Sequence, residues 1–295
     1  MINKIIYIML MLTATLSFTA CQSDDKLDPT SIFDTNPPKR DALEQWLQEN
    51  YTYPYNIDFK YKMEDIESDM KYTLVPADSA KAAKLAILIK YLWLESYDEV
   101  AGITFTKTYV PRIIHLIGSA AYNSNGTIVL GTAEGGLKIT LYIVNSLTQS
   151  SISNPQTLNT YYFKTMHHEF GHILNQKKPY DAGFKLISEA SYIGDDWYLS
   201  SDEEANQKGF VTPYAQSEPN EDFVENIAVY VTSTKAQWQA ILDAAGTDGA
   251  ATILRKFAIV KAYMKDSWDI DLDQLHDVVQ RRQSEIKYLD LETLK

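Results

Sequence analysis

The sequence predicts an α+β fold for residues 41–295, with a small mixed sheet, then a helix that carries a histidine motif, then a mainly helical C-terminal lobe. Three observations predict this fold. Short alternating or apolar segments gather between residues 103 and 144, as strands do. From residue 157 onward, longer segments carry apolar residues three and four positions apart, as helices do. Finally, 45% of the 295 residues are hydrophobic, which is enough for a core and excludes a disordered chain.

The first elements of the predicted domain are helices. Residues 41–49 form a short helix with one apolar face, and residues 80–95 form a longer one with apolar residues at helical spacing. The segment Pro-Ala-Asp-Ser at 76–79 offers an N-cap for the longer helix. Residues 51–61 are rich in aromatic side chains and are predicted to be irregular, whereas 63–74 shows no pattern that predicts an element.

Four strands are expected next, at residues 103–109, 112–117, 127–130 and 137–144. The first alternates between apolar and polar side chains, and the second and fourth are apolar runs of the kind that buried strands show. The sequence Asn-Ser-Asn-Gly at 123–126 indicates a turn before the third strand. His115 lies within the second strand and is predicted to be a core residue rather than a metal ligand.

The second half is predicted to be helical, apart from a stretch after Lys177 that is rich in loop-forming residues. The expected helices cover residues 157–176, 221–232, 235–245, 249–265 and 272–286. The acidic residues at 195–196 and 202–204 lack EF-hand spacing, so we interpret them as solvated loops rather than as a calcium site.

The first 20 residues resemble a secretory signal peptide. Lys4 precedes an apolar run at 5–12 that is too short to span a membrane. Cys21 and the alanine before it resemble a bacterial lipobox, in which cleavage exposes the cysteine for acylation. Residues 21–40 would then form a lipidated tether, and the acidic residues after Cys21 resemble those of surface-exposed lipoproteins of Bacteroidota. We therefore expect a lipid anchor in the bacterial outer membrane, on its outer face.

Charge and cysteine usage exclude several classes of function. The formal net charge is -12 and no run of Lys and Arg occurs, so nucleic-acid binding is not expected. Cys21 is the only cysteine, which leaves no intramolecular disulfide, no zinc ribbon and no Cys-His nucleophile in the folded domain. A Gly-x-Ser-x-Gly nucleophile elbow is also absent.

The strongest motif is His-Glu-x-x-His at residues 168–172, inside a predicted helix. Residues four apart share one face of a helix, so His168 and His172 are able to bind one ion. Glu169 lies next to them and is expected to act on metal-activated water as the general base. The pattern predicts a zinc-dependent hydrolase, with His167 on another face of the helix as a bystander or a supporting residue rather than a ligand.

A third protein ligand is needed, and no further histidine follows at short spacing. Glu221 and Glu225 lie four apart at the start of a predicted helix, so either could bind the metal while the other holds a ligand histidine. Without the upstream motif, acidic residues here would simply complement the helix dipole. With it, Glu221 is the preferred ligand.

Two passages resemble the gluzincin site of the anthrax lethal factor catalytic domain. These are His-Glu-Phe-Gly-His at 168–172 and Tyr-x(6)-Glu-x-Phe-x-Glu at 214–225. The resemblance implies a zincin-like fold in which Glu221 is the zinc ligand and Glu225 supports the site. It also implies that Tyr214 stabilises the oxyanion or protonates the leaving group.

Most of the chain is similar to the putative zinc-binding metallopeptidase lipoproteins of Bacteroidota. Residues 209–215 and 221–223 carry this similarity, together with the lipobox. It implies a membrane-anchored zinc metallopeptidase that acts on peptide or protein substrates and serves nutrient uptake. It also implies an outer-membrane importer of the SusC/SusD type as a partner.

Two alternatives remain open at the level of sequence. One is a non-catalytic accessory binding lipoprotein of such an importer, with a vestigial metal site. The other is a metallohydrolase that cleaves another bond, such as one in a glycan or a cell-wall amide. For a peptidase, we expect an extended peptide to align beside the strand at 137–144 by strand addition.

Overall fold

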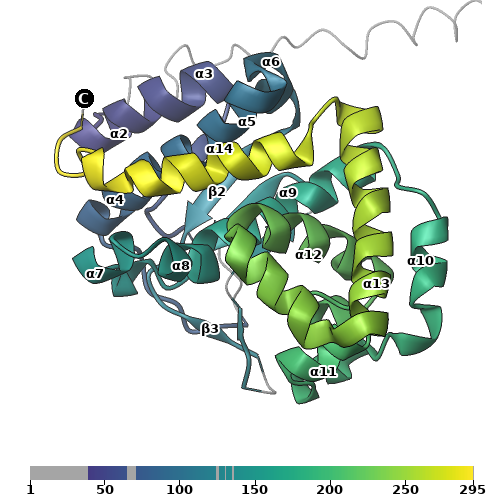
Figure 1. The fold of residues 1–295 in the computed structure, drawn as a ribbon. Coiled ribbons are helices and arrows are strands. Elements are labelled where there is room, and N and C mark those ends of the chain that lie inside the picture. Colours follow the sequence, from purple (N-terminus) through teal and green to yellow (C-terminus); the bar gives the residue numbers. More distant parts are fainter. Residues whose placement is uncertain (1–38, 65–70, 124–125, 130, 135, 295) are drawn as a thin grey trace, which may run out of the picture. The chain divides into compact units, whose positions relative to one another are not determined.

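The computed structural model describes residues 39–64, 71–123, 126–129, 131–134 and 136–294, and Figure 1 shows their arrangement. The predicted signal peptide, Cys21 and nearly all of the predicted tether lie outside these residues. Arg40–Lys295 forms one unit, to which the following description applies. None of the helices described in it combines the length and the apolar character that crossing a membrane requires.

The main sheet has four strands in the order β1-β2-β6-β5. Its members are β1 (Asp58–Lys60), β2 (Ile113–Leu116), β6 (Lys138–Leu141) and β5 (Gly131–Glu134). The first three are mutually parallel, and β5 runs antiparallel to β6 with Gly131 opposite Leu141. Side chains along β2 and β6 are almost all buried, as expected for strands covered on both faces. A separate hairpin pairs β3 (Ala121–Tyr122) with β4 (Ile128–Val129).

The sheet corrects three expectations. Residues 103–109 form helix α6 (Ile103–Tyr109) rather than a strand. β1 lies within the segment predicted to be irregular, and β5 was not predicted at all. The strand within 137–144 is interior, because β2 and β5 pair with its two edges, so it offers no edge to a peptide. Among the described strands, β5 is the edge on that side of the sheet.

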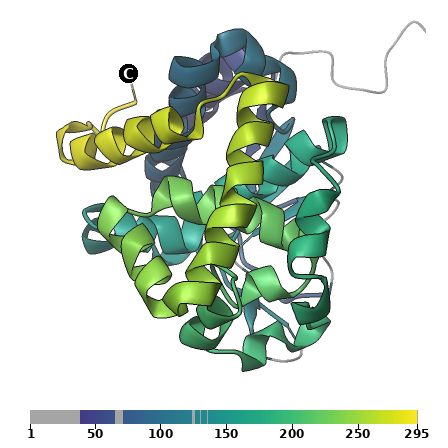
Figure 2. The same cartoon turned by 45° about the vertical axis from the view of Figure 1, so that its right-hand side comes forward.

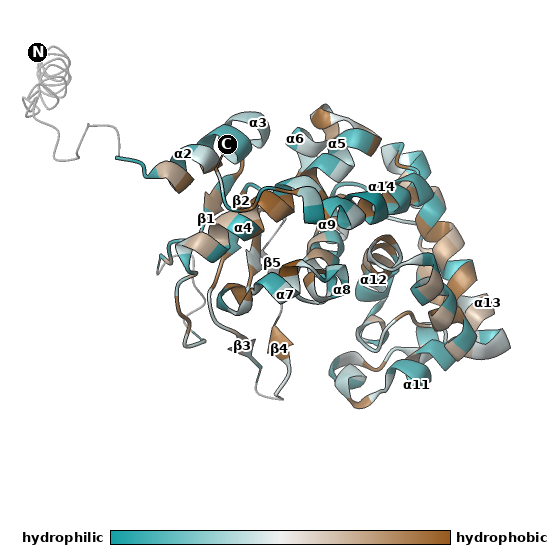
Figure 3. Cartoon of the chain, turned by 60° about the vertical axis from the view of Figure 1, so that its left-hand side comes forward, coloured by the Kyte–Doolittle hydropathy of each residue, from teal (hydrophilic) through white to brown (hydrophobic). Residues whose placement is uncertain are grey.

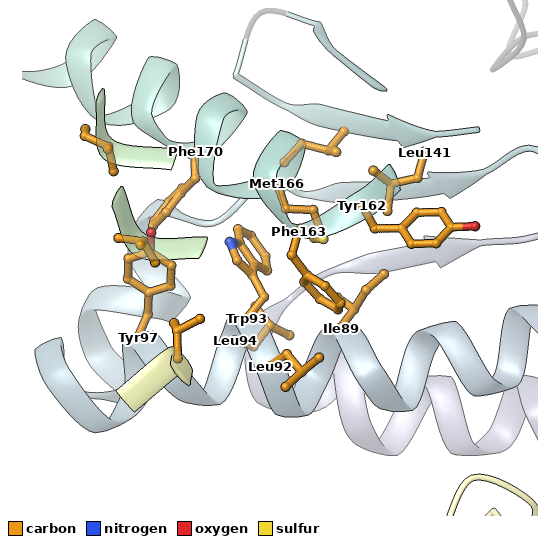
Figure 4. Close-up of a cluster of buried hydrophobic side chains, with 14 of the residues drawn as sticks. Ile89, Leu92, Trp93, Leu94, Tyr97, Leu141, Tyr162, Phe163, Met166 and Phe170 are labelled. Atoms are coloured by element: carbon orange, nitrogen blue, oxygen red, sulfur yellow. The ribbon is translucent and has the colours of Figure 1, made fainter. Parts of the chain in front are cut away.

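The N-terminal helices precede β2 and contribute many buried side chains to the core. They are α2 (Ala42–Leu47), the π-helical η1 (Gln48–Thr52), α3 (Tyr53–Tyr55), α4 (Ser79–Ile89), the π-helical η3 (Lys90–Leu94) and α5 (Glu95–Ala101). Within the predicted N-cap segment 76–79, it is the side chain of Asp78 that caps α4, accepting a hydrogen bond from the backbone of Lys81. Figure 4 shows Trp93 and Tyr97 from this group packed near Met166 and Phe170 of the motif helix.

The motif helix is α9 (Lys164–Lys177), and short helical segments lead into it. These are η4 (Val144–Ser146), α7 (Gln149–Ile152), α8 (Pro155–Leu158) and the π-helical η5 (Asn159–Phe163). Asn154 caps α8 through the backbone N–H groups of Gln156 and Thr157. The predicted helix at 157–176 is therefore confirmed, with a π-helical turn near its start.

Short helices and then three long ones build the second half. The short ones are α10 (Gly183–Ile187), η6 (Glu189–Ser191), η7 (Gly194–Leu199), α11 (Asp202–Gln207) and η8 (Tyr214–Gln216); the long ones are α12 (Pro219–Thr232), α13 (Lys235–Trp268) and α14 (Leu272–Glu285), followed by η9 (Ile286–Tyr288). Gly246 breaks α13 with φ 65 and ψ -169, where two separate helices were predicted. Figure 2 shows α13 running past α12, and Figure 3 shows hydrophobic colouring along the central α12.

The acidic residues at 202–204 are not in a loop. They form the first turn of α11, where Ser201 and Glu204 make a capping box. Acidic side chains in a first helical turn complement the helix dipole, which explains their clustering without a bound ion. His115 is fully buried in β2, as predicted.

Candidate metal centre

Two histidines on α9 face the same side of the helix. His168 and His172 have ring centroids 4.8 Å apart, and their Nε2 atoms are separated by 3.2 Å. Gly171 lies between them, at a point where α12 passes very close: a Cβ at this position would lie 2.9 Å from Cγ1 of Val224. The glycine therefore lets the two helices approach closely enough for side chains on α12 to reach the histidines.

Glu221, in the first turn of α12, completes the cluster. Its Oε2 atom lies 2.9 Å from Nε2 of His168 and 3.3 Å from Nε2 of His172. One nitrogen or oxygen from each of these three side chains falls within 4.8 Å of the others. Among the described residues this is the group of His, Cys, Asp and Glu side chains suited to hold a metal ion. Two imidazoles and one carboxylate form a donor set that zinc prefers, so the residues fit this ion.

Glu225 lies one helical turn further along α12 and plays a different part. Its Oε1 accepts a hydrogen bond from Nδ1 of His168 at 2.8 Å, so it lies at the distal side of that ring. Its Oε2 accepts from Nζ of Lys164 at 3.1 Å and from the hydroxyl of Thr212 at 2.6 Å. The geometry thus places Glu221 at the Nε2 atoms of both histidines and Glu225 behind the ring of His168, and it favours Glu221 of the two candidate ligands.

Glu169 and Tyr214 border the same centre. Glu169 follows His168 on α9 and lines the adjoining cavity. The ring of Tyr214, in η8, lies 5.7 Å from that of His168 and makes an edge contact with Trp197 at 5.0 Å. Burial and the charge of Glu221 raise the pKa of Tyr214 far above its usual range, so its phenol stays protonated at neutral pH.

The charges of the cluster are strongly coupled. Burial disfavours the charged form of His168, but hydrogen bonds to Glu221 and Glu225 outweigh burial and raise its pKa to about 9. Burial likewise opposes the charge on Glu221, but hydrogen bonds from His168 and His172 lower its pKa to about 2. Burial raises the pKa of Glu169 above its ordinary value. The site is therefore built around negative carboxylates that require positive charge beside them.

The pKa of Glu225 is held well below its usual range. Burial works against the charge, but the ammonium of Lys164 and the hydrogen bonds from His168 and Thr212 outweigh it. A buried carboxylate with three donors remains an anion and fixes the ring that it binds.

The cluster lies at the floor of a cleft. A cavity of about 580 Å³ extends from His168 and His172 toward Tyr180 and Lys185. A second cavity of about 380 Å³ shares His168, Glu169, Tyr214 and Gly131 with the first, and extends toward Trp197. Volumes of this size lie within the range of roughly 300–1,000 Å³ that ligand pockets show. Gly131 belongs to the edge strand β5, so the sheet edge borders the cleft.

Several residues of the site could not be identified from the sequence pattern. The one signal for Lys164 is its spacing, because it lies one helical turn before His168. Thr212, Trp197 and Gly131 carry no such signal. Other residues lie where they were expected to. His167 is buried on another face of α9, where its Nδ1 lies 2.9 Å from the hydroxyl of Tyr97.

Comparison with known proteins gives a consistent result. The model of a family described as "Putative zinc-binding metallo-peptidase" matches residues 36–273. A crystal structure described as a putative zinc-binding metallo-peptidase from Bacteroides caccae ATCC 43185 is similar in sequence and fold, with 49% identity and a TM-score of 0.77. The match covers 90% of this chain and 100% of that one. No curated protein matches the chain.

Proposed function

This chain belongs to the family of putative zinc-binding metallo-peptidases, and from this premise we propose that it hydrolyses peptide bonds at a zinc ion held by His168, His172 and Glu221. The observation that carries the proposal is the convergence of these three side chains, within 4.8 Å of one another, at the floor of a cleft. Three protein ligands are what catalytic zinc sites use, since the fourth position serves water or substrate.

Bound zinc would polarise the substrate carbonyl and lower the pKa of its water to about 7. Glu169 is next to the ligands and takes the proton from the attacking water. Its burial raises its pKa, which brings it nearer to the operating pH, as suits a general base. Tyr214 keeps its proton at neutral pH and donates a hydrogen bond to the oxygen on which negative charge develops.

The ligand set and the adjacent tyrosine support a gluzincin-type site in a zincin-like fold. The zincin-like fold is further supported by the active-site helix, α9, which lies beside a sheet whose edge strand borders the cleft. β5 runs along this edge, so an extended peptide would add to β5 rather than to the interior strand β6. Main-chain hydrogen bonds to such an edge bind peptides with little regard for sequence, and the cleft walls then select the side chains.

The cellular setting is proposed from the N-terminal sequence. A lipid on Cys21 would tether the enzyme to the outer membrane, facing the exterior, where peptide products could pass to an importer of the SusC/SusD type. Radiolabelled palmitate incorporation into the wild-type chain and into a Cys21→Ser variant tests the anchor. Protease treatment of intact cells tests the face of the membrane.

The catalytic proposal is tested by Glu169→Ala, with Glu203→Ala as a matched control on the exposed surface of α11. The first variant should still bind zinc, since Glu169 is not a ligand. It should lose about 10²- to 10⁴-fold in peptide turnover, the usual contribution of a general base. Unchanged turnover would refute the assignment of Glu169. A zinc-loaded wild-type protein that cleaves no member of a broad peptide library would refute the peptidase and favour a binding lipoprotein.

A further inference from the structure

We propose that Asp222 and Lys256 are positioning residues for the metal centre, because their buried ion pair fixes the first turn of α12 and with it the carboxylate of Glu221. The inference rests on the proposed role of Glu221 as a zinc ligand. Neither Asp222 nor Lys256 lines the cleft or touches the three ligands, so the chemistry described above does not use them.

The pair is completely buried. Nζ of Lys256, on α13, lies 2.7 Å from Oδ2 of Asp222, and both side chains are 0% exposed. The same ammonium lies 3.9 Å from the centre of the Phe210 ring, over its face. Burying two charges costs several kcal/mol for each ion, and an apolar pair of the same shape is often as stable or more stable. Stability alone therefore gives no reason for a charged pair here.

The ion pair instead fixes the orientation of the Asp222 carboxylate. The carboxylate of Asp222 accepts hydrogen bonds from three sides: from Lys256, from the hydroxyl of Tyr192 at 2.9 Å and from the amide of Asn226 at 3.1 Å. These donors come from α13, from the segment before η7 and from α12 itself. A carboxylate held from three elements has one orientation, whereas packed methyl groups would allow the helix to slide or rotate slightly.

The start of α12 needs such a device. Its N-cap residue is Glu218, whose side chain makes no capping hydrogen bond, and Pro219 follows it. Successive residues on a helix point about 100° apart, so Glu221 faces the histidines while Asp222 faces α13. The contact of Asp222 therefore sets the rotation of the turn that presents Glu221.

The part of α13 that carries Lys256 is itself tightly packed. Backbone approaches between the α11 region and α13 are very close: a Cβ at Gly209 would lie 2.4 Å from Cγ2 of Thr252, and a Cβ at Gly249 would lie 2.5 Å from the carbonyl oxygen of Asn206. Such contacts leave no room for α13 to shift here.

Tyr192 extends the same control to the other side of the cleft. The residue after it, Ile193, donates its backbone N–H to the carbonyl of Gln216 at 2.8 Å, within the segment that begins with Tyr214. Trp197, a few residues later, packs on the ring of Tyr214. The Asp222–Lys256 pair thus connects the third ligand to the tyrosine through one set of directed contacts.

The test compares zinc affinity with folding stability. The double variant Asp222→Leu with Lys256→Met replaces the pair by apolar side chains of similar size. We expect its denaturation midpoint without zinc to match that of the wild type, and its zinc affinity, measured by competition with a chelator, to fall about tenfold or more. The matched control removes the exposed pair at the C-terminal end of the same helix, by Lys265→Met with Asp269→Asn, and should leave zinc affinity unchanged.

A second double variant separates direction from charge. Asp222→Asn with Lys256→Gln removes both charges but retains a directed hydrogen bond, and it should recover most of the zinc affinity. If the apolar double variant binds zinc as tightly as the wild type, the positioning role is overturned while the proposed function stands. If the wild type itself binds no zinc, both fall.

A milder change keeps the inference testable if the apolar double variant does not fold. Tyr192→Phe deletes one hydroxyl that donates to Asp222, and it should lower zinc affinity about threefold, in line with the loss of one hydrogen bond. Unchanged zinc affinity in a folded Tyr192→Phe variant would also overturn the positioning role.

Discussion

The position of the proton on His168, a proposed zinc ligand, is fixed by a single residue. Glu225 can only accept a hydrogen bond, so Nδ1 of His168 must carry the proton in their 2.8 Å contact. Nε2 is then the nitrogen that faces Glu221 and a metal ion, and the carboxylate behind the ring increases its basicity. Lys164 and Thr212 occupy the remaining oxygen of Glu225, so it has no free position from which to compete for the ion.

The buried His167 leads to a prediction about pH. Burial lowers its pKa to about 3, below the value of about 6.5 in an unfolded chain. The unfolded state therefore binds the extra proton between these values, and stability present above pH 6.5 is lost as the pH falls toward 3. Between pH 6.5 and 5 the wild type should lose about 2 kcal/mol relative to a His167→Gln variant. Urea unfolding of both proteins with a chelator present measures this, and parallel losses would contradict it.

The glycine inside the motif leads to a prediction about packing. Gly171→Ala would place a methyl group against Val224, in contact with two of its atoms at 2.9 and 3.1 Å. Overpacking lowers the unfolding free energy by about 1–3 kcal/mol, and the higher helix propensity of alanine offsets about 1 kcal/mol of this loss. We expect a net loss near 1 kcal/mol in unfolding free energy and weaker zinc binding, since α12 must move away from α9.

The partner change supplies the control for Gly171→Ala. Adding Val224→Ala removes the methyl groups that the new side chain would meet, so the double variant should recover zinc affinity. A double variant that binds zinc no better than Gly171→Ala alone would show that the approach of the two helices is not what the glycine provides.

Among single residues, the sequence could predict those whose role follows from their spacing along one helix. The spacing of His168 and His172 places both on one face of any helix, whatever surrounds it. The choice between Glu221 and Glu225 could not be derived from spacing, because both lie on one face of α12 and only the crossing of α12 over α9 separates their roles. Lys164 and Thr212 were missed because their partner, Glu225, comes from a distant segment.

Whole elements were predictable where one pattern covered many residues. The long helices in the second half were predicted with ends close to those observed, and Gly246 explains the gap between two of them. The alternation in 103–109 predicted a strand, but Phe105 and Tyr109 also have helical spacing, and in α6 their rings lie 5.0 Å apart. Gly102, at φ 84, reverses the chain so that this short helix packs on α5. β1 (Asp-Phe-Lys) and β5 (Gly-Thr-Ala-Glu) contain one large apolar residue between them, so neither shows the apolar pattern by which β2 and β6 were predicted.

The attachment of the last helix leads to a prediction at this scale. Arg282 on α14 donates to the carbonyl of Tyr91 and to Glu95 and Glu99 at 3.0–3.1 Å, and only 12% of its side chain is exposed. Arg282→Met keeps the apolar stem but removes charge-assisted hydrogen bonds, so it should lower the unfolding free energy by about 2 kcal/mol. The control Lys265→Met removes an exposed pair on α13 and should change stability by less than about 0.5 kcal/mol. Equal effects in a denaturation experiment would contradict the prediction.

The molecule as a whole assembles its site from three separate segments of the chain. The histidines and Glu169 come from α9, which packs on the sheet and the N-terminal helices. Glu221 comes from α12, and Tyr214 from the loop-rich stretch between them. A site shared in this way would link metal binding to the packing of α12 on α9, which no single segment could reveal alone.

Metal removal should therefore be visible in global stability. An ion that binds the folded state and not the unfolded chain adds about 2.7 kcal/mol when its free concentration is 100-fold above Kd. For a chain of this size that corresponds to a rise in Tm of about 5–10 °C. We expect zinc to raise the Tm of the wild type and a chelator to reverse the rise. Glu169→Ala should respond as the wild type does, because its side chain is not a ligand, whereas Glu221→Gln should lose most of the response, because its carboxylate joins α12 to the histidines on α9. An equal rise in Tm for Glu221→Gln would show that the third ligand is another residue. No rise in the wild type would show that the folded protein does not bind zinc.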